Sequence, residues 1–228
     1  MRIAEIYSSK QGEGLLTGQP SVFVRTSGCN LRCAFCDTPF TSWNPQGEQQ
    51  TLDEIVERVA VWQGQHVVIT GGEPMLPPEI VRLTERLRAG SRHITIETAG
   101  TVYQPVECDL MSISPKLSNS TPERGRAGDW STRHEASRIK LEVLRRLTSE
   151  FEHQLKFVVA DPSDLPEIET LLAQLEMIKP DRVLLMPEGI TLEALRSRET
   201  WLRPLCDERG FRFCPRMHIE WYGNKRGT

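Results

Sequence analysis

The sequence of 228 residues has no long hydrophobic run and no large excess of charge of either sign. No apolar stretch approaches the roughly 20 residues that a membrane-spanning helix needs, and residues 1–5 do not resemble the apolar region of a signal peptide. The 28 basic and 31 acidic residues leave a net charge of −3, so no overall field favours nucleic acid or an anionic membrane. We therefore expect a cytoplasmic protein that binds neither a nucleic acid nor a membrane.

Internal repeats, low-complexity tracts and linkers are also missing, so nothing in the sequence divides the chain. Its length can bury one sizeable core, and a content of 38% hydrophobic and 26% charged residues is ordinary for a globular protein. We predict a single domain over residues 1–228. Its tail, residues 215–228, should dock on the core because Ile219, Trp221 and Tyr222 give it an apolar surface.

The cysteines are few but unevenly placed. Three of the six, Cys29, Cys33 and Cys36, lie close together in a C-x3-C-x2-C spacing. Short spacings of this kind supply the thiolates that bind iron–sulfur clusters. Three thiolates on one loop can hold three irons of a 4Fe–4S cluster, and the fourth iron then stays open to another ligand. We expect the chemistry of this protein at that open iron.

A structural zinc site is the alternative that the cysteines leave open. Such a site usually takes four ligands, commonly as two separated pairs. The other cysteines, Cys108, Cys206 and Cys214, form no matching pair with one another or with the five histidines. We interpret these three as packing thiols in a reduced chain, and His218, which has no identifiable partner, as a packing or surface histidine.

Strands and helices alternate along the sequence. Hydrophobic periodicity and turn residues, together with a capping box at Thr51 and Glu54, set the predicted boundaries. The predicted strands span residues 2–7, 20–26, 66–70, 93–97, 109–114, 154–159, 182–186 and 211–214. The predicted helices span residues 51–63, 78–88, 134–150, 163–177 and 192–208. A polar loop follows Lys116 up to about residue 132, and we interpret it as a lid or a binding loop. A further hypothesis is that it excludes water from the site.

This alternation predicts an α/β fold with a mainly parallel sheet and right-handed crossovers. About six βα steps are fewer than the eight of a closed barrel, so we expect an incomplete (β/α)6-type barrel. Five unusual motifs each follow a strand, and the carboxyl ends of parallel strands share one rim. These motifs are the cysteine loop, GGEP at 71–74, ETAG at 97–100, SPK at 114–116 and MPEG at 186–189.

Several polar residues near this rim have residue types that suit binding. Arg25, on the strand that leads into the cysteine loop, could clamp a carboxylate with its planar guanidinium. The hydroxyl of Thr38 is a hard oxygen that suits Mg²⁺, although a local turn would also use it. Glu73, beside two glycines, could accept hydrogen bonds from an ammonium group. Lys116 could also bind a ligand, but it could equally be an ordinary surface cation.

The cysteine spacing, with an aromatic residue just before Cys36, resembles the signature of the radical S-adenosylmethionine (SAM) enzymes. In that superfamily SAM binds the open iron, and reduction of the cluster yields a 5′-deoxyadenosyl radical. The GGEP motif at 71–74 resembles the element that holds the methionine amino group of SAM. A glycyl-radical activase shares both features and remains an alternative.

Further motifs restrict the resemblance to one family of this superfamily. With QGEG at 11–14, Arg25, GCNLRCAFCDT at 28–38 and GNKRGT at 223–228, the sequence resembles the 7-carboxy-7-deazaguanine synthase family from about Ile6 onward. The resemblance implies a lyase that contracts the ring of 6-carboxy-5,6,7,8-tetrahydropterin to 7-carboxy-7-deazaguanine, with loss of ammonia, on the route to queuosine. It also implies catalytic use of SAM, dependence on Mg²⁺, a homodimer, and an electron donor such as flavodoxin or ferredoxin.

The same resemblance implies roles for individual residues. Cys29, Cys33 and Cys36 bind the cluster, and Thr38 contacts Mg²⁺. The residues that would face SAM are Gly72, Ser114, Pro115, Lys116, Met186, Pro187, Glu188 and Gly189. The residues that would face the pterin are Lys10, Gln11, Gly12, Glu13, Arg25, Thr70 and the carboxylate of Thr228.

Overall fold

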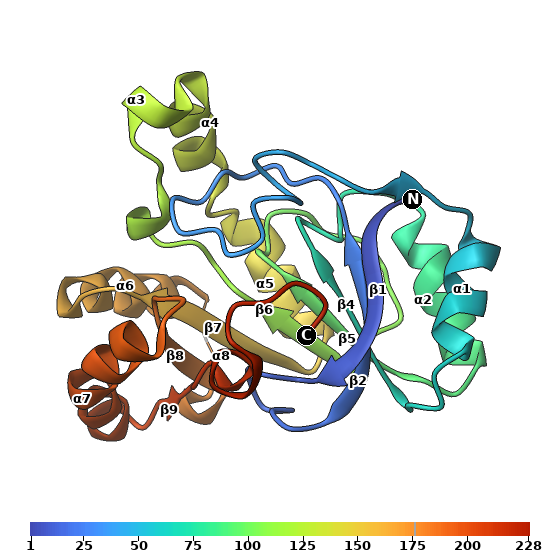
Figure 1. Cartoon of the computed structure of the whole chain (residues 1–228). Helices are drawn as coiled ribbons and strands as arrows, with labels where there is room; N and C mark the ends of the chain where they lie inside the picture. Colours follow the sequence, from blue (N-terminus) through green and yellow to red (C-terminus); the bar gives the residue numbers. More distant parts are fainter. Residues whose placement is uncertain (176) are drawn as a thin grey trace.

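The computed structural model describes residues 1–175 and 177–228. In these residues nine strands form one sheet in the order β3-β1-β2-β4-β5-β6-β7-β8-β9, with helices packed against it (Figure 1). The strands are β1 (Arg2–Lys10), β2 (Pro20–Thr26), β3 (Glu48–Gln49), β4 (His66–Gly71), β5 (His93–Thr98), β6 (Leu110–Ile113), β7 (His153–Val159), β8 (Val183–Pro187) and β9 (Arg212–Phe213). The α-helices are α1 (Leu52–Ala60), α2 (Ile80–Ala89), α3 (Arg124–Ala127), α4 (Asp129–Ser137), α5 (Leu141–Glu150), α6 (Leu165–Leu175), α7 (Leu192–Arg209) and α8 (Met217–Tyr222). The 3-10 turns are η1 (Ser118–Ser120), η2 (Pro162–Asp164) and η3 (Pro180–Arg182).

The sheet is mainly parallel, as predicted. From β2 through β4, β5, β6, β7 and β8 to β9, each strand pairs in parallel with its neighbour. Among the described strands only β1 runs in the opposite direction, and it pairs antiparallel with β2 on one side and with β3 on the other. β1 reverses because residues 11–19 are too few for a crossover helix. The order of strands ends at β3 and β9 without closing, which is the architecture of an incomplete barrel.

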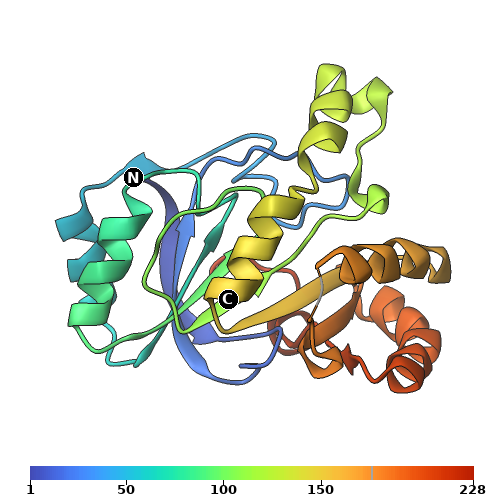
Figure 2. The ribbon, with the colours of Figure 1, turned by 180° about the vertical axis from the view of Figure 1, so that it is seen from behind.

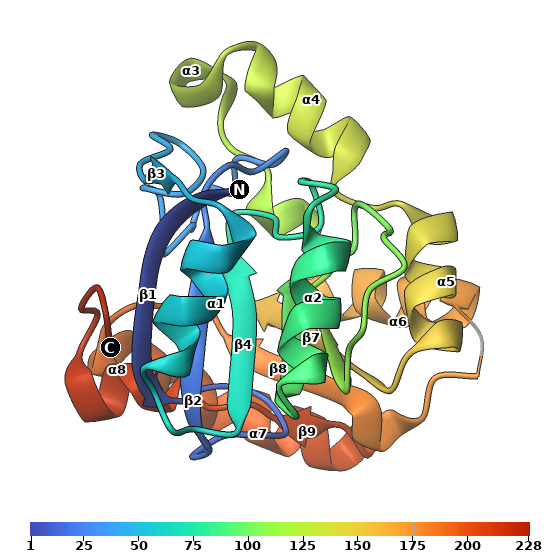
Figure 3. The same ribbon diagram turned by 90° about the vertical axis from the view of Figure 1, so that its right-hand side faces the viewer.

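Successive side chains along each strand point to opposite faces of the sheet. On β4, Val67 and Ile69 belong to the hydrophobic core, whereas Thr70 faces the opposite side. On β7, Phe157 belongs to the core and Lys156 points the other way. Helices α1, α2, α5 and α6 cover the core side of the sheet, as the views from behind and from the side show (Figures 2 and 3). The other side is therefore free to carry polar groups.

The first helix begins as the sequence predicts. Thr51 Oγ1 accepts the backbone N–H of Glu54 at 3.2 Å, and the Glu54 carboxylate accepts the N–H of Thr51 at 2.7 Å. This reciprocal pair satisfies two of the N–H groups that a helix leaves free at its start. Ile55 and Val59 then face the core.

The region after Lys116 differs from the prediction. It was expected to be a loop up to residue 132, but it contains η1, α3 and α4. The helix predicted over 134–150 is two helices, α4 and α5, because Lys140 has φ −123° and ψ 86°, outside the helical region. The break lets α4 pack on the cysteine loop while α5 buries Leu144 and Leu147 in the core.

Other elements differ as well: β1 extends to Lys10 beyond the predicted residue 7, α1 ends at Ala60 before the predicted residue 63, and β3 was not predicted. The tail contains the helix α8, which the sequence analysis did not predict. The helix predicted over 163–177 ends at Leu175, and residue 176 lies outside the described residues. Among the described helices, none has the length and apolarity to cross a membrane.

Phe157 tests the packing on the core side of the sheet. It is fully buried at 0% exposure, so we expect Phe157→Ala to lower the free energy of unfolding by about 3–5 kcal/mol, since it leaves a cavity. Urea unfolding of the apo protein measures this loss. Trp62→Ala, at a residue 39% exposed, is the control and should change stability by less than about 0.5 kcal/mol. Equal effects of the two substitutions would contradict this description of the core.

Candidate active site at the carboxyl ends of the strands

A cavity of about 500 Å³ opens at the carboxyl ends of the parallel strands. Residues from the cysteine loop and from the GGEP, ETAG, SPK and MPEG motifs border it, as the convergence of motifs on one rim predicted. The predicted site residues that line it are Lys10, Gln11, Gly12, Glu13, Arg25, Cys29, Cys33, Cys36, Thr38, Thr70, Gly72, Ser114, Lys116, Met186, Glu188, Gly189 and Thr228. Of the predicted site residues, Pro115 and Pro187 do not line it.

The three cysteines of the loop line the same wall of the cavity and carry free thiols. The backbone turns tightly between them, since Cys36 N–H donates to Cys33 O at 3.3 Å. The N–H of Leu31 donates to Cys29 Sγ at 3.4 Å, and Cys36 Sγ lies 3.2 Å from Ser42 Oγ. Burial raises the pKa of Cys29 to about 12 and of Cys33 to about 11, so metal binding must release protons here. The three free thiols of this loop match in number and type the donor set of a 4Fe–4S cluster with one open iron. Among the described residues no three such side chains are yet gathered around a common metal position.

The GGEP loop lies directly against the cysteine loop. Gly71 has φ +133°, which favours glycine, and a Cβ on Gly72 would lie 2.0 Å from the carbonyl oxygen of Gly28. The N–H of Glu73 donates to that same oxygen at 2.9 Å. Both glycines are therefore needed for the close approach of the two backbones.

Glu73 does not have the role that the sequence suggested. It is 1% exposed and does not line the cavity. Its carboxylate accepts hydrogen bonds from Thr98 Oγ1 at 2.7 Å, Ala99 N–H at 2.8 Å and Met75 N–H at 3.1 Å. The expectation that it receives an ammonium group is wrong, because the carboxylate is buried away from the cavity, where it joins the ends of β4 and β5.

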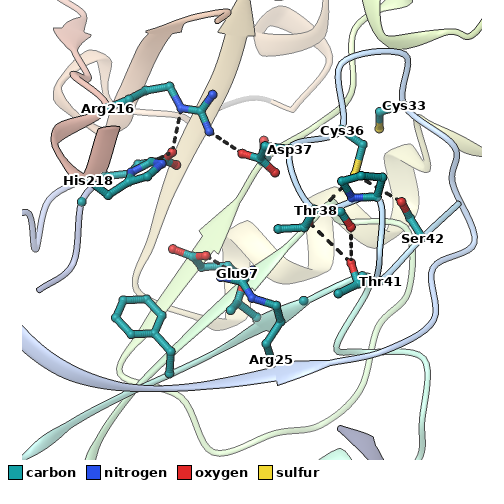
Figure 4. Close-up of a pocket in the computed structure, with 18 of the residues that line it drawn as sticks. Arg25, Cys33, Cys36, Asp37, Thr38, Thr41, Ser42, Glu97, Arg216 and His218 are labelled. Carbon is teal, nitrogen blue, oxygen red and sulfur yellow. Dashed lines mark hydrogen bonds and ion pairs between the residues drawn. The ribbon is translucent and has the colours of Figure 1, made fainter. Parts of the chain in front are cut away.

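A buried charge cluster closes one side of the cavity (Figure 4). Glu13 forms ion pairs with Lys156 and with Arg216, whose Nε lies 3.1 Å from Glu13 Oε1. Arg216 also pairs with Asp37 and donates to the carbonyl oxygen of Gly189 at 2.6 Å. Burial alone would raise the pKa of Glu13, but the charges of Lys156 and Arg216 hold it well below its ordinary value. The sequence analysis singled out Glu13 but missed Lys156 and Arg216.

Two further residues of this region pack against the QGEG loop. His218 lines the cavity with Nδ1 3.8 Å from Glu13 Oε1, too far for a hydrogen bond, and burial lowers its pKa, so the neutral ring lies there as a packing histidine. Cys214 is buried, as expected of a packing thiol, and its sulfur accepts the N–H of Gly14 at 3.2 Å. A side chain at Gly12 would collide with His218, which explains the glycine there.

Gln11, Thr70 and Glu97 form a hydrogen-bonded polar surface of the cavity, here called the polar floor, and Glu97 joins the other two. One carboxylate oxygen accepts from Gln11 Nε2 at 3.0 Å and the other from Thr70 Oγ1 at 2.8 Å. Neighbouring Arg25 donates to Glu5 Oε1 at 2.7 Å and to Tyr7 Oη at 2.8 Å, and its side chain is 16% exposed. Glu97 was part of a noted motif, but we did not predict it as a site residue.

Three predicted residues remain. Thr38 lies beside the cysteines, where its carbonyl oxygen accepts the hydroxyl of Thr41 at 2.9 Å. Lys116 Nζ donates to Ser114 Oγ at 2.7 Å, so it is anchored and not a free surface cation. Thr228 lines the cavity with the rest of residues 224–228.

Comparisons with known proteins agree with this geometry. The family model described as the Radical SAM superfamily matches residues 23–116. A 7-carboxy-7-deazaguanine synthase of Rhodopirellula baltica is 48% identical over 227 residues, which cover 99% of this chain and 88% of that protein. The chain belongs to the 7-carboxy-7-deazaguanine synthase family. A second synthase of this family, from Halobacterium salinarum, is 47% identical over 95% of this chain and 88% of its own.

Structural comparison supports the same family. The crystal structure of QueE from Escherichia coli superposes with a TM-score of 0.70 at 26% identity, covering 95% of this chain and 94% of the other. The predicted family and partial-barrel fold are confirmed. Membership of the radical SAM superfamily implies a 4Fe–4S cluster and SAM as cofactors, which replaces the zinc-module interpretation.

The contact of Gly72 with the cysteine loop can be tested directly. We expect Gly72→Ala to lower the unfolding free energy of the apo protein by about 1–3 kcal/mol, because the new Cβ forces two backbones apart. Iron bound after reconstitution should fall as well. Gly64→Ala is the matched control, since its Cβ would meet only the Val22 side chain at 3.8 Å. Wild-type stability and iron content in Gly72→Ala would contradict the close packing.

Proposed function

We propose that the cavity carries out the family's reaction with the cluster on one wall and the pterin on the polar floor. The enzyme is a radical SAM lyase that forms 7-carboxy-7-deazaguanine by ring contraction, in the biosynthesis of queuosine and related 7-deazapurines. The observation that carries the proposal is the meeting of three free thiols and a hydrogen-bonded polar floor in one cavity of about 500 Å³. This volume is typical of sites for small molecules.

The cysteine wall would hold the cofactors. Cys29, Cys33 and Cys36 bind the cluster, which with SAM supplies a 5′-deoxyadenosyl radical. Gly72, residues 114–116 and residues 186–189 border the adjoining space and orient SAM there. Lys116, fixed by Ser114, places a positive charge beside this space.

The polar floor would hold the pterin. Glu97 is an acceptor for ring N–H groups, and its bonds to Gln11 and Thr70 fix its direction. Arg25 clamps the substrate carboxylate. The backbone at Lys10 and Gly12, the side chain of Glu13 and the carboxylate of Thr228 complete the contacts to the pterin.

The chain's own residues fix the groups around the reacting carbon. Thr38 would hold Mg²⁺ through its hydroxyl, and the bound cation would supply a positive charge for the oxygen atoms of the substrate. The ion pairs of Arg216 with Glu13 and Asp37 join the pterin side to the cysteine loop. Neither side can shift without breaking an ion pair of the buried Arg216 side chain, which keeps the two reactants at a fixed distance.

The broader setting follows from the same chemistry. We place the enzyme in the cytoplasm, because free thiols and an iron–sulfur cluster need a reducing compartment. An electron donor such as flavodoxin or ferredoxin reduces the cluster, and the active form is a homodimer. The chain works as one domain, residues 1–228, with the tail 215–228 docked through Arg216 and His218.

Anaerobic incubation tests the proposed reaction. The reconstituted protein, given SAM, a reductant, Mg²⁺ and 6-carboxy-5,6,7,8-tetrahydropterin, should release 7-carboxy-7-deazaguanine, identified by mass analysis. SAM should be regenerated in each cycle, so product should exceed SAM when SAM is limiting. A cluster-replete sample that forms no deazaguanine would overturn the assignment.

Thr38 tests the metal site. We expect Thr38→Ala to lose at least about tenfold in kcat/KM, or about 1.4 kcal/mol of transition-state stabilisation, and to need more Mg²⁺ for half-maximal activity. Thr38→Ser keeps the hydroxyl and should remain close to wild type. The rate as a function of Mg²⁺ concentration measures both. Full activity of Thr38→Ala with unchanged Mg²⁺ dependence would remove Thr38 from the metal site.

A further inference from the structure

Residues 118–137 pack on the outer side of the cysteine loop. None of the described residues between Leu117 and Leu155 lines the cavity, so this segment does not act there as the lid that we expected. It contacts the loop from behind. The N–H of Ala34 donates to the carbonyl oxygen of Ser120 at 2.8 Å, which fixes the loop just after Cys33.

His134 makes the second contact, from the middle of α4. Its side chain is completely buried, and its Nδ1 accepts the backbone N–H of Arg32 at 3.1 Å. A backbone N–H can only donate, so Nδ1 carries no proton and the proton of the neutral ring is on Nε2. Nε2 lies 2.9 Å from Ser120 Oγ, which in turn donates to the carbonyl oxygen of Leu117 at 2.6 Å. Every polar atom in this chain of bonds has a partner.

The neutral form of His134 is also the stable one. Burial lowers its pKa to about 4, so the ring remains an acceptor at physiological pH. A protonated ring would present N–H on both sides and could not accept the Arg32 amide. Burial of the ring thus keeps it neutral and maintains the hydrogen bond from the Arg32 amide to Nδ1.

Arg32 is held by its side chain as well. Its Nη1 donates to the carbonyl oxygens of Cys29 and Leu31, both at 2.8 Å, and its guanidinium lies 4.0 Å from the ring centroid of Trp130 on α4. The backbone between the first two cysteines is therefore fixed by an amide, a guanidinium and an aromatic ring. Since none of these groups reaches the cavity, they act only on the shape of the loop.

We propose that His134 is a positioning residue for the cluster: its Nδ1 atom fixes the loop between Cys29 and Cys33, so that the thiols face the cavity before iron binds. The inference rests on the proposed function in one respect, that these thiols hold the cluster. His134 touches neither the cluster nor the substrate and acts through the Arg32 amide. Outer partners of metal ligands commonly affect metal retention by 10–100-fold.

Two substitutions separate the hydrogen bond from packing. His134→Asn is smaller than histidine but keeps an oxygen that can accept the Arg32 N–H. His134→Leu fills the space better but cannot accept a hydrogen bond. The measurement is anaerobic release of iron from the reconstituted holoenzyme to a chelator, with the EPR spectrum of the reduced cluster recorded for each variant.

We expect His134→Leu to release iron about tenfold or more faster than wild type, with a changed EPR spectrum, and His134→Asn to lie within about threefold of wild type. Thr132→Ala, at an exposed position of the same helix, is the control and should match wild type. The reverse order, with Leu holding iron better than Asn, would mean that His134 acts by packing alone and would overturn the proposal.

The wild-type apo protein gives a test that needs neither folded variants nor the cluster. Hydrogen exchange should show the Arg32 amide protected at least about tenfold relative to an exposed amide of the same loop. An Arg32 amide that exchanges at the exposed rate would overturn the proposal whatever the enzyme's activity. Failure of the wild-type protein to bind iron would instead count against the proposed function.

Discussion

The ion pairs of Glu13 hold together segments that lie far apart in the sequence. Lys156 comes from the inner side of β7, Arg216 from the start of the tail, and Asp37, the second partner of Arg216, from the cysteine loop. Removing one member of a buried pair leaves an uncompensated charge, which typically costs about 3–5 kcal/mol. Because Arg216 also binds the carbonyl oxygen of Gly189, the positions of four loops depend on this one cluster.

The division of each strand into a core side and a polar side explains how the cavity is ready before any ligand binds. Strands of parallel sheets are commonly apolar on both faces. Here the inner face carries pairs such as Gln154 with Ser112, at 2.7 Å, and Thr70 with Glu97, at 2.8 Å. Polar groups that already have partners keep their directions in the empty site, so binding does not have to order them.

Much of this arrangement could be predicted from the sequence. Hydrophobic periodicity and caps located the strands and the main helices, and the motifs at the strand ends, such as the cysteine loop, indicated the rim. The charged residues that complete the site, Lys156 and Arg216, could not be predicted. Lysine and arginine are usually exposed to solvent, and nothing in the sequence marks these two as buried. Helix α4 was missed for a related reason. Its one buried residue is His134, so it lacks the apolar stripe by which a helix is recognised.

Sequence distance has a consequence for synthesis. Glu13 and Arg216 are 203 residues apart. Their ion pair therefore cannot form until nearly the whole chain has left the ribosome. The cysteine loop, by contrast, emerges early, and its support from α4 follows about a hundred residues later, well before the tail. During synthesis the cysteine loop and α4 are therefore both present before Arg216, which completes the ion pairs of Glu13.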